Sequence, residues 1–307
     1  MFYDLNIEYN ATLRAPLRDA ELSRTLSFVS EMGYNCVALN HTISGKIPAD
    51  ISCVIPDPLP FASPASLTIL RRCTLVLSEA AANNRVAALS SNYDILAVRP
   101  VDEKTFQHAC NTTDCDVISL DLSQRLGYHF KFKTVSEAIK RGVRFEVCYS
   151  QGVTGEPLAR RNLISNVTQL IRATRGRGLI VSSEAKRALG CRAPWDVVNL
   201  VEVWGLPHDR SHEAISKEAR SVVVSARLKR ESFRGVVTVV YGGQKPAPSE
   251  PAQKHTTKPA DKDDASKKRK AENLTDSDTL GDGKPISKRE QKRRAKAAVT
   301  TLQPTIG

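Results

Sequence analysis

The chain has 307 residues and is 41% hydrophobic, which is enough apolar material for one large domain or two ordinary ones. Its formal net charge of +12 favours an anionic partner, and nucleic acid ranks ahead of a membrane because no apolar run approaches the roughly 20 residues of a spanning helix. Residues 1–10 have neither the basic nor the continuous apolar segment of a secretory signal, so we expect an intracellular protein.

The first predicted element is a strand over residues 2–9, FYDLNIEY, in which polar and apolar residues alternate. Alternation places Asp4, Asn6 and Glu8 on one face of the strand and the apolar side chains on the other. Barrel hydrolases often begin with such a strand, and their inward polar positions carry histidines that bind a metal. Here those positions hold Asp, Asn and Glu, so the strand leaves open whether the protein is an enzyme.

Six more strands are predicted from apolar runs, at residues 34–39, 73–78, 93–98, 115–120, 144–150 and 178–183. Helical patterns lie between several of them, at residues 18–33, 102–112, 134–142 and 157–176. We expect Gly33 to end the first of these helices and Gly142 the third, which Thr134 and Glu137 would begin with a capping box. A strand followed by a segment that can cross back over a sheet is the pattern of parallel βα units.

Seven mostly apolar strands imply a sheet that is covered on both faces or closed on itself. An open doubly wound sheet and a TIM-type barrel both fit this pattern, and periodicity does not choose between them. After the seventh strand, residues 197–206 and 214–230 are more typical of helices, so an eighth strand is not obvious. A barrel built from this sequence would therefore be irregular.

Composition changes near Gly242, and we divide the chain into a folded domain at residues 1–243 and a tail at residues 244–307. The tail lacks aromatic residues and is rich in Pro, Lys, Asp, Ser and Thr, so it cannot bury enough apolar surface to offset its conformational entropy. We predict that it is disordered. Two basic blocks in it indicate a nuclear address or nonspecific RNA contacts: residues 288–294, and Lys267, Lys268, Arg269 and Lys270.

The seven cysteines are widely spaced and lie mostly in apolar runs, so we expect buried free thiols in a reducing compartment. Cys110 and Cys115 form a single C-x4-C pair without adjacent histidines, which is a poor zinc signal. His208 and His212 have the spacing of a zinc-protease helix, but a solvated first helical turn explains them as well. His41 alone follows a strand where a barrel would place a functional side chain, and one ligand does not make a metal site.

Basic residues are concentrated after the sixth strand, where acids are scarce between Glu156 and Glu184. Arginine donates two parallel hydrogen bonds to phosphate, so the cluster suits RNA, although a solvated helix face would have the same composition. The segment HFKFK at residues 129–133 interleaves aromatic and basic residues, which suits single-stranded RNA. It would equally well anchor two Phe rings in the core, which is the interpretation we favour for this segment.

Four segments together resemble a known family: residues 93–110, YDILAVRPVDEKTFQHAC; residues 116–150, DVISLDLSQRLGYHFKFKTVSEAIKRGVRFEVCYS; residues 159–185, ARRNLISNVTQLIRATRGRGLIVSSEA; and residues 192–200, RAPWDVVNL. They are similar to the TIM-barrel protein subunit of ribonuclease P, the thirty-kilodalton family of archaea and eukaryotes, which in eukaryotes also serves ribonuclease MRP. The resemblance implies a TIM-like, irregular α/β barrel of about seven parallel strands. It also implies a PHP-like fold without the histidine ligands, which fits Asp4 and Asn6.

In such ribonucleoproteins the RNA subunit and its Mg²⁺ ions remove the 5′ leader of precursor tRNA, so the resemblance implies a scaffold that has no catalytic residues and binds no cofactor. Its implied partners are ribonuclease P RNA, MRP RNA, a small RRM-like subunit and other subunits, with precursor tRNA contacted indirectly and no membrane. A nuclear, nucleolar location and a role in ribosomal RNA processing follow as expectations. The RNA contacts we expect are Arg160, Arg161, Arg172, Arg175, Arg177, Ser182, Ser183, Arg187, Arg192, Lys131 and Lys133.

The alternative from another class is a metal-dependent, PHP-like phosphoesterase. It would use His41 with Asp4 and Glu8, the acids that alternation places on the inward face of the first strand.

Overall fold

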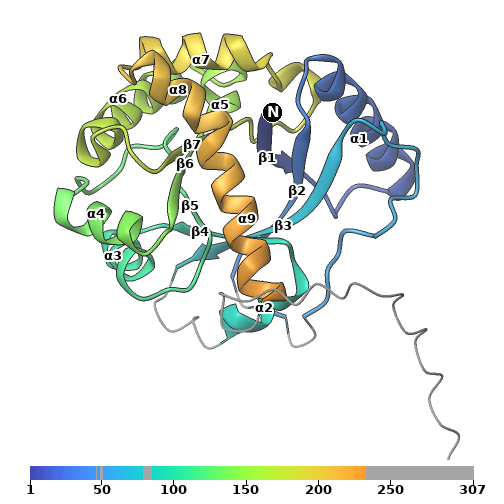
Figure 1. Ribbon diagram of the computed structural model, residues 1–307, viewed down its shortest axis with the longest axis horizontal. Coiled ribbons are helices and arrows are strands. Elements are labelled where there is room, and N and C mark those ends of the chain that lie inside the picture. The colour runs from blue at the N-terminus through green and yellow to red at the C-terminus, as the bar shows by residue number, and fades with distance from the viewer. Residues whose placement is uncertain (46, 49–50, 79–84, 233–307) are drawn as a thin grey trace, which may run out of the picture. The chain divides into compact units, whose positions relative to one another are not determined.

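A computed structural model describes residues 1–45, 47–48, 51–78 and 85–232 (Figure 1). The chain divides into two units, Met1–Gln244 and Lys245–Gly307, and all of the described residues belong to the first. The predicted start of the tail and its two basic blocks lie outside the described residues.

The described residues form one parallel sheet whose strands follow the chain order from β1 to β7. The strands are β1 (Tyr3–Glu8), β2 (Cys36–Ile43), β3 (Thr68–Leu77), β4 (Ile95–Pro100), β5 (Val117–Ser119), β6 (Arg144–Cys148) and β7 (Leu179–Ser182). All seven predicted strands are therefore present, with shifted ends.

The sheet comes back on itself just beyond β7. The Glu184 N–H donates to the Asn6 carbonyl at 2.8 Å, and the Glu8 N–H donates to the Ala185 carbonyl at 3.2 Å. A parallel bridge between Ile7 and Ala185 accompanies these bonds. The fold is thus a nearly closed barrel, which confirms the TIM-like architecture over the open sheet, and the described residues after β7 contain no eighth strand.

Helices surround the barrel and connect its strands (Figure 1). They are α1 (Ala15–Glu31), α2 (Val86–Asn92), α3 (Glu103–Asn111), α4 (Phe132–Lys140), α5 (Ser150–Thr154), α6 (Pro157–Thr174), α7 (Pro194–Val203), α8 (His208–Ile215) and α9 (Lys217–Glu231), with a 3₁₀ turn η2 (Ala188–Gly190). Gly33 and Gly142 follow α1 and α4 with φ of 95° and 88°, as their predicted role as helix stops requires.

The predicted capping box at the start of α4 is wrong. The Val135 N–H already donates to the Lys131 carbonyl at 3.1 Å, so Lys131 is the N-cap and Thr134 lies inside the first turn. Thr134 and Glu137 carry a purely local signal. The N-cap is three residues earlier than predicted, because the turn that includes Phe132 already makes helical hydrogen bonds.

The last helix, α9, closes the end of the barrel at which the strands begin, and it crosses the middle of Figure 1. The first inward side chains of the strands form an apolar floor there: Tyr3, Leu5, Cys36, Ala38, Ile95, Ala97, Val117 and Ile180. Ala219, Val222 and Ala226 of α9 pack against this floor. A second, larger apolar cluster fills the space between the barrel wall and the outer helices. A single helix therefore plugs the end of the barrel.

All seven cysteines are free, and all but Cys53 are buried, as predicted. Burial raises the pKa of the Cys36, Cys73 and Cys110 thiols to about 12, so these groups remain neutral at physiological pH. In the part of the chain that the structure describes, no helix has both the length and the apolar character needed to span a membrane.

Candidate functional site

The centre of the barrel contains a buried ion pair between Arg72 of β3 and Glu146 of β6. Both side chains are fully buried, and the guanidinium donates to the two carboxylate oxygens at 2.5 and 2.6 Å. Nη1 of Arg72 also donates to the Leu5 carbonyl at 2.7 Å. Burial opposes ionisation of Glu146, but the charge and hydrogen bonds of Arg72 outweigh it, so the Glu146 pKa lies below its ordinary value.

Amides and a hydroxyl surround this pair. Asn6 Nδ2 donates to Glu146 Oε2 at 3.2 Å and Asn40 Nδ2 donates to Asn6 Oδ1 at 2.9 Å. Thr74 Oγ1 donates to Asn40 Oδ1 at 2.7 Å and accepts from Arg72 Nε at 3.3 Å. The interior is thus a connected polar network, and its positive charge is the guanidinium of Arg72. Asn6, predicted to face inward, serves as an internal tie.

The predicted alternation of β1 fails at Asp4. The register between β1 and β2 shifts between Asp4 and Ile7, so Asp4 leaves the face that Asn6 and Glu8 share. Its Oδ1 accepts from the Ser183 N–H at 3.0 Å, and Tyr34 and other outer-core residues surround it. Burial raises the pKa of Asp4 to about 6, more than its hydrogen bonds lower it. Asp4 is therefore an outer-wall group.

The ligand set of the alternative phosphoesterase does not assemble. His41 follows Asn40 in β2, so it points away from the interior that Asn40 faces, and Asp4 is in the outer wall. His208 pairs with Glu202 at 3.1 Å, and the His212 ring stacks on Trp195 with centroids 5.5 Å apart. Among the described residues, no three His, Cys, Asp or Glu side chains are placed to hold a metal.

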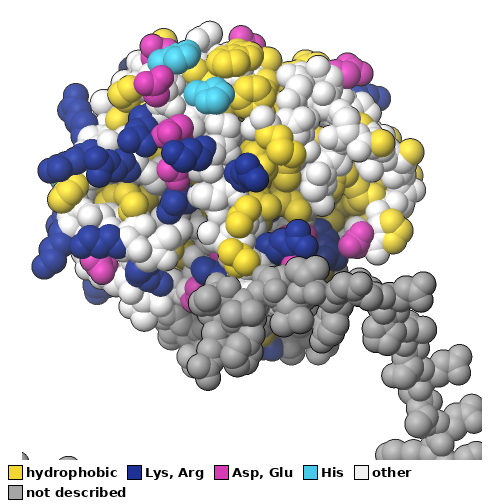
Figure 2. Space-filling model, viewed as in Figure 1, with side chains coloured by type: hydrophobic (Ala, Val, Ile, Leu, Met, Phe, Trp, Pro, Cys, Tyr) yellow, Lys and Arg dark blue, Asp and Glu magenta, His cyan; other side chains and the backbone are white. Residues whose placement is uncertain are grey.

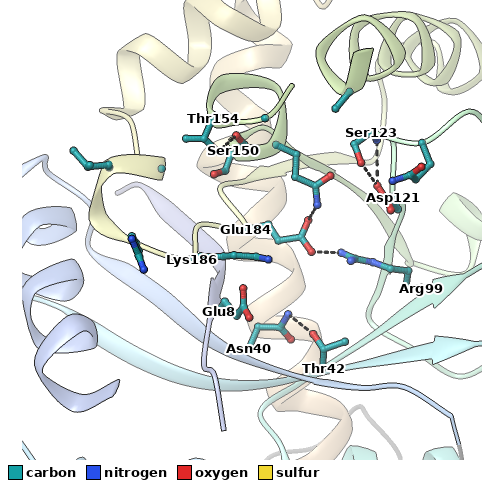
Figure 3. Close-up of a pocket in the computed structure, with 17 residues that line it drawn as sticks. Glu8, Asn40, Thr42, Arg99, Asp121, Ser123, Ser150, Thr154, Glu184 and Lys186 are labelled. Atoms are coloured by element: carbon teal, nitrogen blue, oxygen red, sulfur yellow. Dashed lines mark hydrogen bonds and ion pairs between the residues drawn. The ribbon is translucent and has the colours of Figure 1, made fainter. Parts of the chain in front are cut away.

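A pocket of about 820 Å³ opens at the carboxyl ends of the strands, where TIM-type barrels carry their sites (Figure 3). Arg99 of β4 crosses it and donates to Glu184 Oε1 at 2.6 Å and to Ser119 Oγ at 3.0 Å. Gln151 Nε2 donates to the other Glu184 oxygen at 3.0 Å. Burial lowers the Arg99 pKa, but the charge of Glu184 outweighs burial, so the Arg99 pKa rises and its guanidinium stays charged.

Glu184 adopts φ of 54°, a left-handed conformation that an L-residue other than glycine enters only under constraint. The bonds to Arg99 and Gln151 supply that constraint. Glu8 and Lys186 point toward the middle of the same pocket (Figure 3) and make no ion pair with any described residue. Sequence reasoning did not single out Arg99 or Glu184. Strict alternation along β4 from Ile95 would have placed Arg99 at the inner mouth.

A basic face lies on the outside of the barrel, over α4 and the end of α6. Arg175 caps α6 in the left-handed conformation, with φ of 55°, and its guanidinium lies 4.4 Å above the Phe132 ring. Lys131 and Lys133 flank that ring in sequence, and we define the α4–α6 basic face as Lys131, Lys133, Arg172, Arg175 and Arg177. All five side chains are exposed, and Lys and Arg gather over these helices at the left of Figure 2.

The HFKFK segment divides between two roles. Phe130 packs against Phe106 and Tyr128 with centroids 5.6 and 5.9 Å apart, as the predicted core anchor. Phe132 is 48% exposed and instead supports Arg175. Lys131 pairs with Glu103 at 2.8 Å, but both side chains are largely exposed, so this pair holds Lys131 weakly.

The remaining residues predicted to contact RNA are elsewhere. Arg161 is exposed at the first turn of α6, eleven residues before Arg172, which corresponds to about 17 Å along the helix. Arg187 is exposed beside the mouth pocket. Arg160 and Arg192 donate to backbone carbonyls, at 2.7 Å to Gly152 and 2.8 Å to Leu189.

Ser182 and Ser183 are 1% and 0% exposed, inside the barrel wall. Ser183 Oγ donates to the Asn6 carbonyl at 3.2 Å. A macromolecule cannot reach these two hydroxyls, so we leave both serines out of the proposed surface.

The described residues thus define a parallel α/β barrel plugged by a helix, with an internal ion pair at its centre and a basic outer face. The chain belongs to the RNase P subunit p30 family, whose model matches residues 1–231.

Two curated relatives support this membership. The chain is 34% identical over 239 residues to a probable ribonuclease P protein subunit 3 of Schizosaccharomyces pombe, covering 77% of this chain and 98% of the relative. It is 32% identical over 260 residues to ribonuclease P protein subunit p30 of Mus musculus, covering 81% and 93%. A chain in a cryo-EM structure of archaeal ribonuclease P with mature tRNA has the same fold, with a TM-score of 0.57 and 12% identity over 79% of this chain and all of that one.

Proposed function

We propose that this chain is a protein subunit of ribonuclease P and of ribonuclease MRP, which binds and stabilises the RNA for 5′ leader removal from precursor tRNA and for ribosomal RNA processing. Membership of the p30 family supports this assignment, as does a relative of Saccharomyces cerevisiae named ribonuclease P/MRP protein subunit RPP1, 29% identical over 254 residues. That match covers 79% of this chain and 86% of the relative.

The observation that carries the RNA-binding role is the α4–α6 basic face. A folded RNA holds many phosphates close together, and fixed cations on a rigid scaffold lower their repulsion without an ordering cost at binding. Arg175 is such a fixed cation, because the Phe132 ring below it limits the positions of its guanidinium. Its left-handed backbone costs about 1 kcal/mol or more, a cost that glycine at this position would avoid.

We propose that the protein is not the catalyst. The ion pair of Arg72 and Glu146 fills the interior in which a related hydrolase barrel would bind its metal, and it leaves no carboxylate of the network free. The proposal assigns the catalytic Mg²⁺ ions to the RNA and no cofactor to the protein.

The proposed partners are ribonuclease P RNA, MRP RNA, a small RRM-like subunit and the other subunits of the complex, with precursor tRNA contacted indirectly. We propose a nuclear, nucleolar location, which the basic block at Lys267, Lys268, Arg269 and Lys270 supports on composition.

Purification of the full chain from cells under native conditions, followed by sequencing of the bound RNA, tests this function. Ribonuclease P RNA and MRP RNA should dominate the sequences. The variant Arg175→Gly should fold as well as wild type, because glycine suits the left-handed position, yet should retain less RNA. Cleavage of precursor tRNA by the purified polypeptide with no RNA present would overturn the assignment.

A further inference from the structure

The mouth pocket is separate from the α4–α6 basic face. None of the five residues of the basic face is among those that line the pocket. Contacts of RNA with these five side chains therefore do not use the groups that line the pocket. At about 820 Å³, the pocket is within the roughly 300–1,000 Å³ range of small-ligand sites.

Three of the six charged side chains that line the pocket, Arg99, Glu184 and Asp121, are already paired. Glu184 accepts from Arg99 and Gln151, and Asp121 accepts from the Ser123 hydroxyl at 2.6 Å. These bonds hold the side of the pocket formed by Arg99, Asp121 and Glu184 in place.

The opposite side of the pocket carries three charged side chains that could bind a ligand, Glu8, Lys186 and Arg187. The Glu8 carboxylate is half-buried and makes no side-chain hydrogen bond or ion pair with a described residue. Lys186 points over it toward the pocket centre (Figure 3), and Arg187 makes only a 3.7 Å contact with Glu21 while 75% exposed. A ligand that satisfies these groups needs N–H donors at one end and negative charge at the other.

We propose that this pocket binds one guanine nucleotide, with the base edge on Glu8 and the phosphate on Lys186 and Arg187. A carboxylate accepts two parallel hydrogen bonds, and guanine is the RNA base that offers two adjacent donors, N1–H and N2–H, on one edge. Lysine and arginine at the rim supply the charge that a phosphate requires. The nucleotide is an unpaired guanine of the partner RNA, and this part of the inference rests on the proposed function. Proteins read RNA sequence mainly at single-stranded nucleotides whose bases are turned out.

The first test is calorimetric titration of the full chain with GMP, AMP, CMP and UMP. We expect saturable GMP binding that is tighter than that of the other three. Glu8→Gln should weaken GMP binding about tenfold and reduce the preference for guanine, because the amide offers one acceptor in place of two. Lys186→Ala should weaken GMP binding and keep the preference. Lys217→Ala, which removes an exposed lysine paired with Glu213 outside the pocket, is the matched control and should change nothing.

The second test uses the assembled ribonucleoprotein and a reagent that modifies N1 and N2 of unpaired guanines. The double variant Glu8→Gln/Lys186→Ala should retain the RNA, because the α4–α6 basic face is intact, while one guanine that wild type protects becomes reactive. Equal thermal melting temperatures of variant and wild type confirm folding, as expected for changes at one half-buried and one exposed side chain.

The two tests separate the possible sources. Loss of protection at one guanine supports the RNA as the source of the ligand. GMP selectivity without any change in the RNA supports the pocket and assigns it to a free guanine nucleotide. If the double variant matches wild type in both GMP binding and guanine protection, the inference is overturned. A wild-type chain that binds no RNA would overturn the proposed function, while the GMP titration would still decide the chemistry of the pocket.

Discussion

At the scale of single residues, the centre of the barrel depends on Arg72 and Glu146, which have no contact with solvent. Removing one partner leaves the other as an unpaired buried charge. We expect Glu146→Ala to lower the free energy of unfolding by about 3–5 kcal/mol. The double change Arg72→Met/Glu146→Leu removes both charges and should cost much less. Urea denaturation of the three proteins measures this, and a double variant as unstable as the single one would show that the pair itself stabilises the fold.

Asp4 gives the stability of the barrel a pH dependence. The folded protein holds the Asp4 proton with a pKa of about 6, against an ordinary value of 3.8, so the folded state binds it more tightly than the unfolded chain. This contribution to stability is present at low pH and is lost as the pH rises through about 4 to 6. Between pH 5 and pH 7, the free energy of unfolding of Asp4→Asn should therefore fall by about 1 kcal/mol less than that of wild type. Denaturation of both proteins at the two pH values tests it, and equal losses would exclude Asp4 as the cause.

At the scale of elements, α9 covers the end of the barrel at which the strands begin. Its small inward residues Ala219 and Ala226 let the helix lie close to the floor, and Val222 fills the space between them. The segment 214–230 was predicted as helix, but α8 ends within it, at Ile215, and α9 begins at Lys217. The break turns α9 across the barrel end.

A pair of substitutions on α9 tests its role as the plug. Val222→Asp buries an unpaired carboxylate against Leu5 and Ile95 and should destabilise the domain by several kcal/mol or prevent folding. Val224→Asp, on the same helix at 46% exposure, should change the free energy of unfolding by about 0.5 kcal/mol or less. Circular dichroism and thermal melting of the two variants make the comparison. Equal stability would show that α9 does not hold the barrel closed.

At the scale of the whole molecule, positive charge lies in two places, the α4–α6 basic face on the outside of the barrel and Arg187 beside the mouth pocket. Each phosphate-contacting cation contributes about one unit to the slope of log K against log salt. We expect Arg172→Gln/Arg175→Gly to lower that slope by about two, measured by filter binding across a salt series. Arg14→Gln/Arg24→Gln removes two exposed arginines at α1, across the barrel from α4 and α6 (Figure 1), and should leave the slope unchanged.

Much of the architecture follows from local chemistry. The seven strands were predictable because each is a short apolar run, and the end of α4 because Gly142 adopts a positive φ without strain. The basic face was predictable only in part. Charge clustering selected Arg172, Arg175 and Arg177, but it also selected Arg160 and Arg192, whose guanidinium groups bond to nearby backbone carbonyls. Sequence spacing does not distinguish an arginine whose guanidinium is free to bind RNA from one whose guanidinium is bonded to the backbone of its own chain.

Apolar runs, glycine stops and ordered motifs are properties of neighbouring residues, so the strands, their parallel order and the family could be predicted from the sequence. Which polar groups meet depends on the three-dimensional fold. Arg72 and Glu146 are 74 residues apart and Glu8 comes beside Ala185, because barrel closure joins strands that are distant in the chain. The register shift in β1 moved Asp4 out of the interior for the same reason, since the position of a strand depends on its neighbours in the sheet as well as on its own alternation.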